Sequence, residues 1–239
     1  MSKRKILMII PAFNEEKNIL KVFEKCRIRK DLVDVLVIND GSTDNTKNIL
    51  ETYGIPHVNL IENVGIGGAV QTGYKYAYQN GYEIAIQFDG DGQHNIEFVE
   101  KLVIPIENGG ADFVIGSRFL EKSMTGFKSS ASRRVGIKII SALIKKCTGK
   151  VITDPTSGFR AANRKVMREF SGNYPTEYPE PDSIVVLLKR GYSVKECPVI
   201  MNERKGGTSS IKSWKNVYYM INVCLSILLT TFSDRGRRE

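Results

Sequence analysis

The amino-acid sequence predicts an α/β fold with a mostly parallel sheet and helices on both of its faces. Short apolar runs alternate with helical patterns through the first half of the chain, and a polar segment follows most of these runs. Strands that alternate with helices form parallel sheets, because each crossover helix returns the chain to the same end of the sheet. At 239 residues the chain is long enough for one large domain.

The alternation extends from residue 5 to residue 116. We expect strands at 5–10, 33–38, 57–61, 83–88 and 112–116, and helices between them at 15–29, 44–53, 67–79 and 96–107. This order predicts a Rossmann-like sheet, in which ligands bind beyond the carboxyl ends of the strands.

The second half of the chain is less regular. Helices are expected at 132–146 and 182–190, a strand at 193–201, and an apolar helix at 217–232. No internal repeat is present, and no linker is long enough to separate two large domains. We therefore divide the chain into a main domain, residues 1–211, and a C-terminal amphipathic helix with a basic tail, residues 212–239.

The composition indicates a soluble globular protein with anionic partners. Lys plus Arg exceed Asp plus Glu by 35 − 26 = 9, which favours nucleotide diphosphates or lipid headgroups. Nucleic acid is disfavoured, because we find no zinc-finger spacing, no RNP-like aromatic motif and no helix-turn-helix. The four cysteines lack paired spacing, which argues against zinc sites and disulfides and fits a reducing cytoplasm.

The most informative stretch is 84–94, where an apolar strand runs into two carboxylates one residue apart. Asp89 and Asp91 point the same way in extended chain, so they can converge on one Mg²⁺ or Mn²⁺ that also binds phosphate oxygens. An EF-hand has a similar spacing of ligands, but His94 stands where that loop needs glycine. A plain Asp-Gly turn is the alternative without a ligand.

The polar segments after the other predicted strands should meet this stretch at one edge of the sheet. They are 11–15, 39–42 and 63–68. Asn14 and Glu15 open a helix and could also cap it. The glycines of 65–68 match a dinucleotide fingerprint poorly, because residue 70 is not glycine and the segment follows the third strand. We interpret Gly67 as close packing of a helix start beside the nucleotide.

Four segments, 11–16, 39–44, 63–67 and 89–94, together resemble the inverting family 2 glycosyltransferases of GT-A fold. The likeness is greatest to enzymes that attach sugars to dolichol or polyprenyl phosphate and to bacterial cell-wall polysaccharide transferases. It continues through 116–118, 156–160 and 203–209, so that it covers roughly residues 5–211. Each short motif is weak alone, but their order and spacing together are specific.

The resemblance implies a role for each matching residue. A divalent cation, Mg²⁺ or Mn²⁺, would be held by Asp89, Asp91 and Gln93. The nucleotide would be bound by residues of the strand-end segments and by basic residues that neutralise its phosphates: Pro11, Phe13, Asn14, Glu15, Asp40, Gly67, Asp89, Gly90, Arg118, Arg133 or Arg134, and Arg204 or Lys205. A departing nucleoside diphosphate builds negative charge, which a metal and fixed cations stabilise.

The segment 178–182 matches the second acidic motif of that family, with two prolines in it. Asp182 is the candidate general base, with Glu180 as its alternative and Asp154 as a third, which could equally be a turn residue. A sugar hydroxyl needs its proton removed as it attacks, whereas a phosphate monoester is already ionised near neutral pH.

The C-terminal helix is bracketed by basic and aromatic residues, a pattern that suits a lipid headgroup interface. Its apolar run of 16 residues would be about 24 Å long, short of the roughly 30 Å needed to span a bilayer. We therefore expect a cytoplasmic protein, peripheral on the inner face of the plasma membrane. A second copy of the chain is the alternative partner for this helix.

Together these features predict a metal-dependent inverting glycosyltransferase. Its donor would be a nucleotide-sugar, with UDP the favoured nucleotide, and its acceptor a polyprenyl phosphate or a lipid-linked saccharide of the cell envelope. Two alternatives are a sugar nucleotidyltransferase and a non-catalytic nucleotide-binding protein of the same fold. The first would normally show a basic glycine-rich loop after the first strand, where 11–16 is acidic and glycine-free. The second would bind nucleotide without turnover.

Overall fold

The computed structural model describes residues 5–90, 92–120, 131–201 and 213–233. The strands are β1 (Ile6–Ala12), β2 (Asp34–Asn39), β3 (His57–Asn59), β4 (Ile84–Gln87), β5 (Phe113–Ser117), β6 (Arg160–Asn163) and β7 (Val194–Pro198). The helices are α1 (Ile19–Arg27), α2 (Thr46–Thr52), α3 (Gly65–Gln79), α4 (Val99–Glu107), α5 (Ala131–Thr148), α6 (Arg164–Gly172), α7 (Pro179–Lys189) and α8 (Ser213–Ser233), with a short 3-10 turn, η1 (Ile96–Phe98), before α4.

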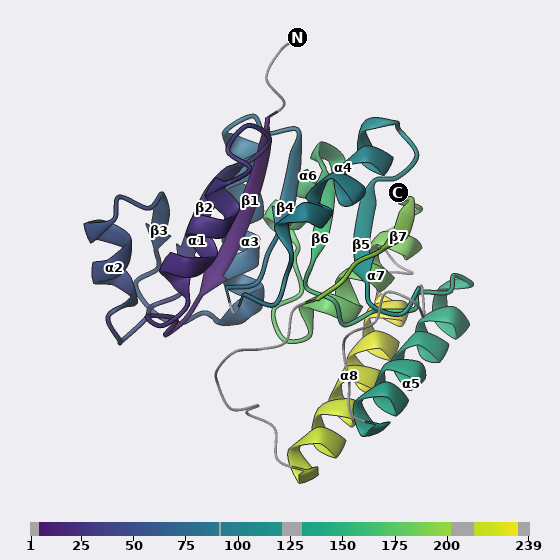
Figure 1. Cartoon of the computed structure of the whole chain (residues 1–239). Coiled ribbons are helices and arrows are strands. Elements are labelled where there is room, and N and C mark those ends of the chain that lie inside the picture. Colours follow the sequence, from purple (N-terminus) through teal and green to yellow (C-terminus); the bar gives the residue numbers. More distant parts are fainter. Residues whose placement is uncertain (1–4, 91, 121–130, 202–212, 234–239) are drawn as a thin grey trace.

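The described strands form one sheet in the order β3-β2-β1-β4-β6-β5-β7 (Figure 1). The pairs β1/β2, β1/β4, β2/β3 and β5/β7 are parallel, whereas β6 is antiparallel to both of its neighbours. The predicted α/β class with a mostly parallel sheet is thereby confirmed.

Alternate side chains of the strands enter two hydrophobic cores, one on each face of the sheet. In β1, Ile6, Met8 and Ile10 face the core formed with α1, α2 and α4. Leu7 and Ile9 face the opposite core, to which α3, α5, α6, α7 and α8 contribute. Because β1 is apolar at every one of these positions, it can occupy the centre of the sheet with helices on both sides.

The sequence patterns missed the antiparallel strand β6 and the helix α6 that follows it. Only four residues form β6, and the arginine at its first position obscures the apolar pattern. The strand exists because β4 and β5 each hydrogen-bond to one of its edges, for example at Ile86↔Ala161 and Val114↔Ala161. Such pairing depends on neighbours distant in sequence, so a local pattern cannot reveal it.

The register of the parallel strands brings three strand ends to one edge. Ala12 at the end of β1 pairs with Asn39 at the end of β2, and β4 runs parallel beside β1. The backbone N–H of Asp40 donates to the carbonyl of Ala12 at 2.9 Å. This hydrogen bond holds the segment after β2 next to the end of β1. The segments after β1, β2 and β4 therefore lie next to one another.

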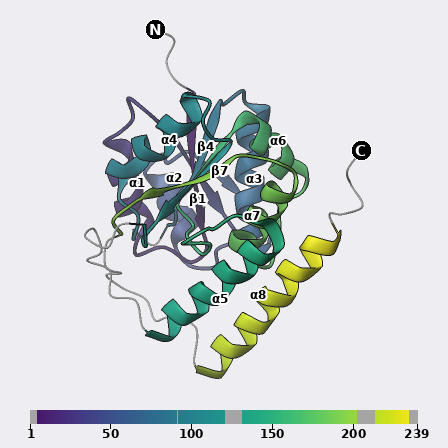
Figure 2. The same ribbon diagram turned by 90° about the vertical axis from the view of Figure 1, so that its right-hand side faces the viewer.

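Helices α5 and α8 lie side by side beyond one end of the sheet (Figures 1 and 2). Val223 and Ile227 of α8 are fully buried in the core shared with α5 and α7. Within the described part of the chain, we find no helix with the length and apolar character needed to cross a membrane. The division of the chain between residues 211 and 212 stays a prediction.

Candidate active site

A cavity of about 440 Å³ opens where β1, β2 and β4 end. Its lining is shared among the three strand-end segments and the start of α3: Pro11, Ala12, Phe13, Glu15, Asp40, Asn63, Gly65, Ile66, Ala69, Asp89 and Gly90. Six of the residues predicted to bind nucleotide therefore border a single space. Phe13 leaves 46% of its surface exposed at this site, so its ring is available to a planar ligand.

Asn14 does not line the cavity, but its hydrogen bonds hold together two of the loops that do. Its backbone has a positive φ of 55°, a conformation that asparagine tolerates better than most residues. The side-chain Oδ1 accepts hydrogen bonds from the backbone N–H groups of Thr43, at 2.8 Å, and Asp44, at 3.3 Å. In return, the N–H of Asn14 donates to Ser42 Oγ at 3.0 Å. Asn14 thus joins the loop after β1 to the loop after β2.

Asp40 lines the cavity and is almost fully buried. Its Oδ1 accepts a hydrogen bond from the N–H of Val64 at 2.8 Å, and its carbonyl accepts one from Asn63 Nδ2 at 3.2 Å. These bonds position the segment that starts α3, which also borders the cavity. Within the described part of the chain Oδ2 has no hydrogen-bond partner, so this acidic oxygen can accept a hydrogen bond from a ligand.

Gly67 lies in α3 and is not among the residues that line the cavity. A Cβ placed on it would come within 2.5 Å of the Thr176 backbone. Glycine here lets the first turn of α3 approach the segment before α7, which agrees with our interpretation of close helix packing. Its predicted place beside the nucleotide stays a prediction.

Asp89, just after β4, is the described member of the predicted carboxylate pair. Its side chain is 36% exposed and lines the cavity. Its Oδ2 accepts a hydrogen bond from His94 Nε2 at 2.8 Å. Burial opposes ionisation of Asp89, but His94, followed by Arg160 and Arg118, outweighs that effect and lowers the pKa of the carboxyl group. The carboxyl group of Asp89 therefore favours its ionised form, and its role as a metal ligand stays a prediction.

This arrangement fits a divalent cation. Mg²⁺ and Mn²⁺ prefer carboxylate and carbonyl oxygens with open positions for phosphate, and Asp89 presents a partly exposed carboxylate to a cavity of nucleotide size. Gln93 is partly exposed, and its predicted contact with the cation stays a prediction. Asp91 lies outside the described residues; among those described, no group of three or more His, Cys, Asp or Glu residues gathers as a metal site.

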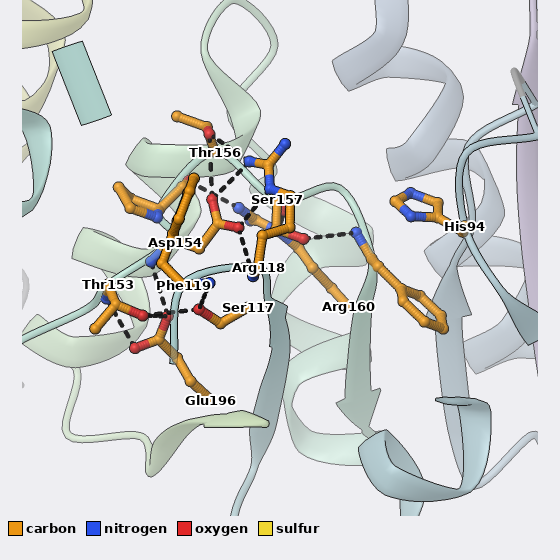
Figure 3. A network of polar contacts seen from close by, with 12 residues as sticks. His94, Ser117, Arg118, Phe119, Thr153, Asp154, Thr156, Ser157, Arg160 and Glu196 are labelled. Carbon is orange, nitrogen blue, oxygen red and sulfur yellow. Dashed lines mark hydrogen bonds and ion pairs between the residues drawn. The ribbon is translucent and has the colours of Figure 1, made fainter. Parts of the chain in front are cut away.

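Arg118, after β5, forms a buried two-point ion pair with Asp154 (Figure 3). Its Nε and Nη2 donate to Oδ2 and Oδ1, both at 2.7 Å, and its backbone N–H donates to Oδ2 at 3.0 Å. The backbone N–H of Asp154 donates in turn to Glu196 of β7 at 2.8 Å. The guanidinium of Arg118 is thus paired with the carboxylate of Asp154. A contact between this arginine and a phosphate stays a prediction.

Asp154 is fully buried within this network. Both of its carboxylate oxygens are engaged by Arg118, and Thr156 Oγ1 approaches Oδ1 at 3.3 Å. A general base needs a free lone pair directed at the acceptor's proton. The observed contacts fix the segment that runs toward β6, and a role of Asp154 as general base stays a prediction.

Glu180, in the first turn of α7, lies near the carboxylate of Asp89. Burial raises the pKa of Glu180 and the negative charge of Asp89 raises it further, whereas Arg160 opposes both. Gln87, at the end of β4, also favours the charged form of Glu180. Glu180 is partly exposed but is not among the residues that line the cavity, and its role as a proton acceptor stays a prediction.

Asp182 faces α8 instead. Ser226 of α8 donates a short hydrogen bond to its Oδ2, and its buried Oδ1 has no hydrogen-bond partner among the described residues. Burial raises the pKa of Asp182 to about 6, with Glu180 adding to the rise and Ser226 opposing it. The prolines at 179 and 181 are compatible with this position, because α7 begins at Pro179 and the first turn needs no N–H from them.

The remaining predicted residues fall in two groups. Arg134 is exposed on α5 and does not line the cavity. Asp91, Arg204 and Lys205 lie outside the described residues. Their roles stay predictions.

Sequence reasoning missed Arg160, the first residue of β6, which is fully buried. Its guanidinium donates to the carbonyls of Ser157 and Pro155 and to Ser183 Oγ, at 2.5, 3.1 and 2.8 Å. It also lies near Asp89 and Glu180 and lowers the pKa of both. The sequence places Arg160 at the end of the motif at 156–160, but this position does not indicate that the side chain is buried.

Comparisons with known proteins agree with this geometry. The model of the family "Glycosyl transferase family 2" matches residues 8–170. The chain is 30% identical over 222 residues, 83% of its length and 86% of the relative's, to a UDP-N-acetylglucosamine–dolichyl-phosphate N-acetylglucosaminyltransferase of Methanococcus voltae. It is 26% identical over 221 residues, 87% of its length and 81% of the relative's, to a polyprenol monophosphomannose synthase of Mycolicibacterium smegmatis.

A solved structure shares the fold. It is glucosyl-3-phosphoglycerate synthase of Mycobacterium tuberculosis in complex with Mn²⁺, UDP and phosphoglyceric acid, with a TM-score of 0.70 at 20% identity. The superposition covers 95% of this chain and 78% of that one. At this identity the likeness is one of fold, and it confirms the GT-A architecture. The family match spans more than half of the chain, and the protein is therefore a glycosyltransferase of family 2.

Proposed function

We propose that this glycosyltransferase moves a sugar from a UDP-sugar to a polyprenyl phosphate, with inversion at the anomeric carbon and with Mg²⁺ or Mn²⁺ as cofactor. The observation that carries the proposal is the cavity at the ends of β1, β2 and β4, which is bordered by Phe13, Asp40 and Asp89. It is supported by the relatives whose names specify UDP-N-acetylglucosamine and dolichyl phosphate, or polyprenol monophosphomannose, and by the neighbour solved with Mn²⁺ and UDP.

Each part of the cavity suits one part of such a donor. The exposed ring of Phe13 can stack on the base, and the Asp40 carboxylate can accept hydrogen bonds from the base. Asp89, Asp91 and Gln93 would hold the cation. When bound, that cation would supply positive charge to the diphosphate as it leaves.

The identity of the acceptor decides whether a base is needed. A polyprenyl phosphate is already ionised near neutral pH and can attack without losing a proton. For an acceptor with a sugar hydroxyl, Glu180 is the carboxylate we favour. Its charge interacts with that of Asp89, whereas Asp154 is paired with Arg118 and Asp182 contacts Ser226.

Replacing Glu180 by Gln separates these two acceptors. With a polyprenyl phosphate acceptor we expect transfer to fall less than about tenfold, because no proton must be removed. With a hydroxyl acceptor we expect a loss of about 10²- to 10⁴-fold, the usual contribution of a general base. The measurement is the initial rate of labelled sugar transfer to each acceptor. A large loss with the phosphate acceptor would contradict the phosphate assignment.

A lipid-linked acceptor requires the site to approach a membrane. Helices α5 and α8 contact each other, and each exposes apolar side chains. These residues, called the apolar stripe, are Val135 and Ile139 on α5, and Ile221, Leu225, Leu229 and Phe232 on α8. The spacing of three or four residues places each set on one helix face. Exposed lysines at 138, 145 and 146 of α5 add positive charge for anionic headgroups.

The experiment that tests the proposed function is calorimetric titration of UDP, GDP and dTDP with and without Mn²⁺, followed by assays of sugar transfer to a short polyprenyl phosphate. We expect tight binding of UDP that depends on Mn²⁺, and transfer from a UDP-sugar. Binding of GDP or dTDP instead would correct the nucleotide, and failure to use polyprenyl phosphate would overturn the acceptor.

A further inference from the structure

The Asp89 carboxylate is contacted by residues that do not line the donor cavity. His94 lies against one of its oxygens, with Nε2 and Oδ2 separated by 2.8 Å. Because an ionised carboxylate can only accept hydrogen bonds, the imidazole carries its proton on Nε2 and donates it. Asp89 is thus oriented from behind by a side chain that is 1% exposed.

Aromatic contacts fix the plane of the His94 ring. Phe159 stacks on it with ring centroids 4.9 Å apart and an interplanar angle of 25°, and Phe88 meets it edge-on at 5.3 Å. Nδ1 is buried without a hydrogen-bond partner among the described residues. The ring therefore directs its one polar contact at Asp89, and rotation of the ring would break that contact without forming another.

Gly158 contacts the same carboxylate. A Cβ built on Gly158 would lie 2.7 Å from both Oδ1 and Oδ2 of Asp89. No side chain fits there, so the backbone of 157–159 lies directly against the carboxylate. That backbone is itself held, because Gly116 of β5 donates from its N–H to the carbonyl of Phe159 at 2.8 Å.

We propose that His94 and Gly158 are positioning residues for Asp89: together they hold its carboxylate in the one orientation that presents it to the cation. This proposal rests on the metal site of the proposed function. It gives a role to the segments at 92–94 and 156–160, which do not line the cavity. Neither residue lines the donor cavity. Partners of this kind typically contribute 10- to 100-fold to metal affinity.

Four variants separate positioning from packing. His94→Phe keeps an aromatic ring for Phe159 but removes the donor. His94→Gln can keep an N–H near the position of Nε2. Gly158→Ala leaves His94 intact and displaces the carboxylate. His57→Phe changes the only other histidine of the chain, which contacts the carbonyl of Ile55 beside β3, and serves as the matched control.

The measurement is Mn²⁺ affinity in the presence of saturating UDP, from the electron paramagnetic resonance signal of free Mn²⁺, with thermal unfolding of each variant alongside. We expect His94→Phe and Gly158→Ala to weaken Mn²⁺ binding about 10- to 100-fold. His94→Gln should recover part of the loss, and His57→Phe should bind as the wild type does.

The outcomes distinguish this proposal from the one on which it rests. Mn²⁺ affinity within twofold of wild type in folded His94→Phe, or in folded Gly158→Ala, overturns the positioning role while the metal site stands. If His94→Phe does not fold, the Mn²⁺ affinities of His94→Gln and Gly158→Ala are used instead. Affinities within twofold of wild type in both folded variants would overturn the positioning role. A wild-type chain that binds no Mn²⁺ with UDP overturns the metal site and the positioning role together.

Discussion

At the scale of single residues, the three acidic candidates for a base differ in what surrounds them. Asp154 has an arginine partner and Glu180 lies near Asp89. Among the described residues, the side-chain partner of Asp182 is a serine hydroxyl from another helix. Residue type and motif position did not distinguish them, because the partner of each lies far away in the sequence. For Asp154 that partner is 36 residues distant, and for Asp182 it is 44.

The raised pKa of Asp182 predicts a pH-dependent stability. An ordinary aspartate titrates near 3.9 in the unfolded chain, and Asp182 titrates at about 6 in the folded protein. Its stabilising contribution is thus fully present below about pH 4 and is lost as pH rises through about 6. The loss amounts to roughly 3 kcal/mol at most, from the difference of about two pKa units.

Asp182→Asn removes this titration and keeps an oxygen that can accept from Ser226. We expect the variant to equal the wild type in free energy of unfolding near pH 4 and to exceed it by up to about 3 kcal/mol at pH 8. Urea unfolding at several pH values measures the difference. A difference that stays constant from pH 4 to pH 8 would show that Asp182 does not titrate in this range.

At the scale of elements, glycines set how closely the helices approach the sheet. Gly73 lies in the middle of α3, where an added Cβ would come within 2.2 Å of Ile9 Cγ2 in β1. Gly172, the last residue of α6, has nothing within 4 Å of such a Cβ. Replacement of glycine by alanine would therefore cause a steric clash at Gly73 but none at Gly172.

We expect Gly73→Ala to lower the free energy of unfolding by about 1–3 kcal/mol, the usual effect of overpacking a core. Gly172→Ala, the matched control, should be neutral or stabilising by up to about 1 kcal/mol, because alanine is the better helix former. Chemical denaturation of both variants measures these changes. Equal effects of the two substitutions would contradict the close approach of α3 to β1.

At the scale of the whole molecule, helices α5 and α8 form a pair at one end of the sheet (Figure 2). The apolar stripe is the set of exposed apolar side chains on these two helices. If this stripe enters a lipid interface, the double variant Leu225→Glu/Leu229→Glu should bind anionic vesicles at least about tenfold more weakly, since each buried leucine contributes about 1.5–3 kcal/mol. Co-sedimentation with phosphatidylglycerol vesicles measures it.

The matched control is Ile61→Glu, which changes a fully exposed isoleucine outside these helices. It should weaken the free energy of vesicle binding by no more than about 1 kcal/mol, the usual effect of one charge near an anionic membrane surface. Vesicle binding that survives the double variant would instead favour a second copy of the chain as the partner of α8. Sedimentation velocity of the wild type would then show a dimer that the double variant loses.

The sequence by itself determined the alternation of strands and helices, the polar segments at the strand ends and the resemblance to family 2 glycosyltransferases. These features are local, or they follow from the rule that parallel strands end at one edge. Tertiary structure decided that β6 runs antiparallel between β4 and β5, and that Asp89 lies between His94 and Gly158. Such contacts join segments that only folding brings together, because strand pairing, burial and charge partners depend on neighbours in space.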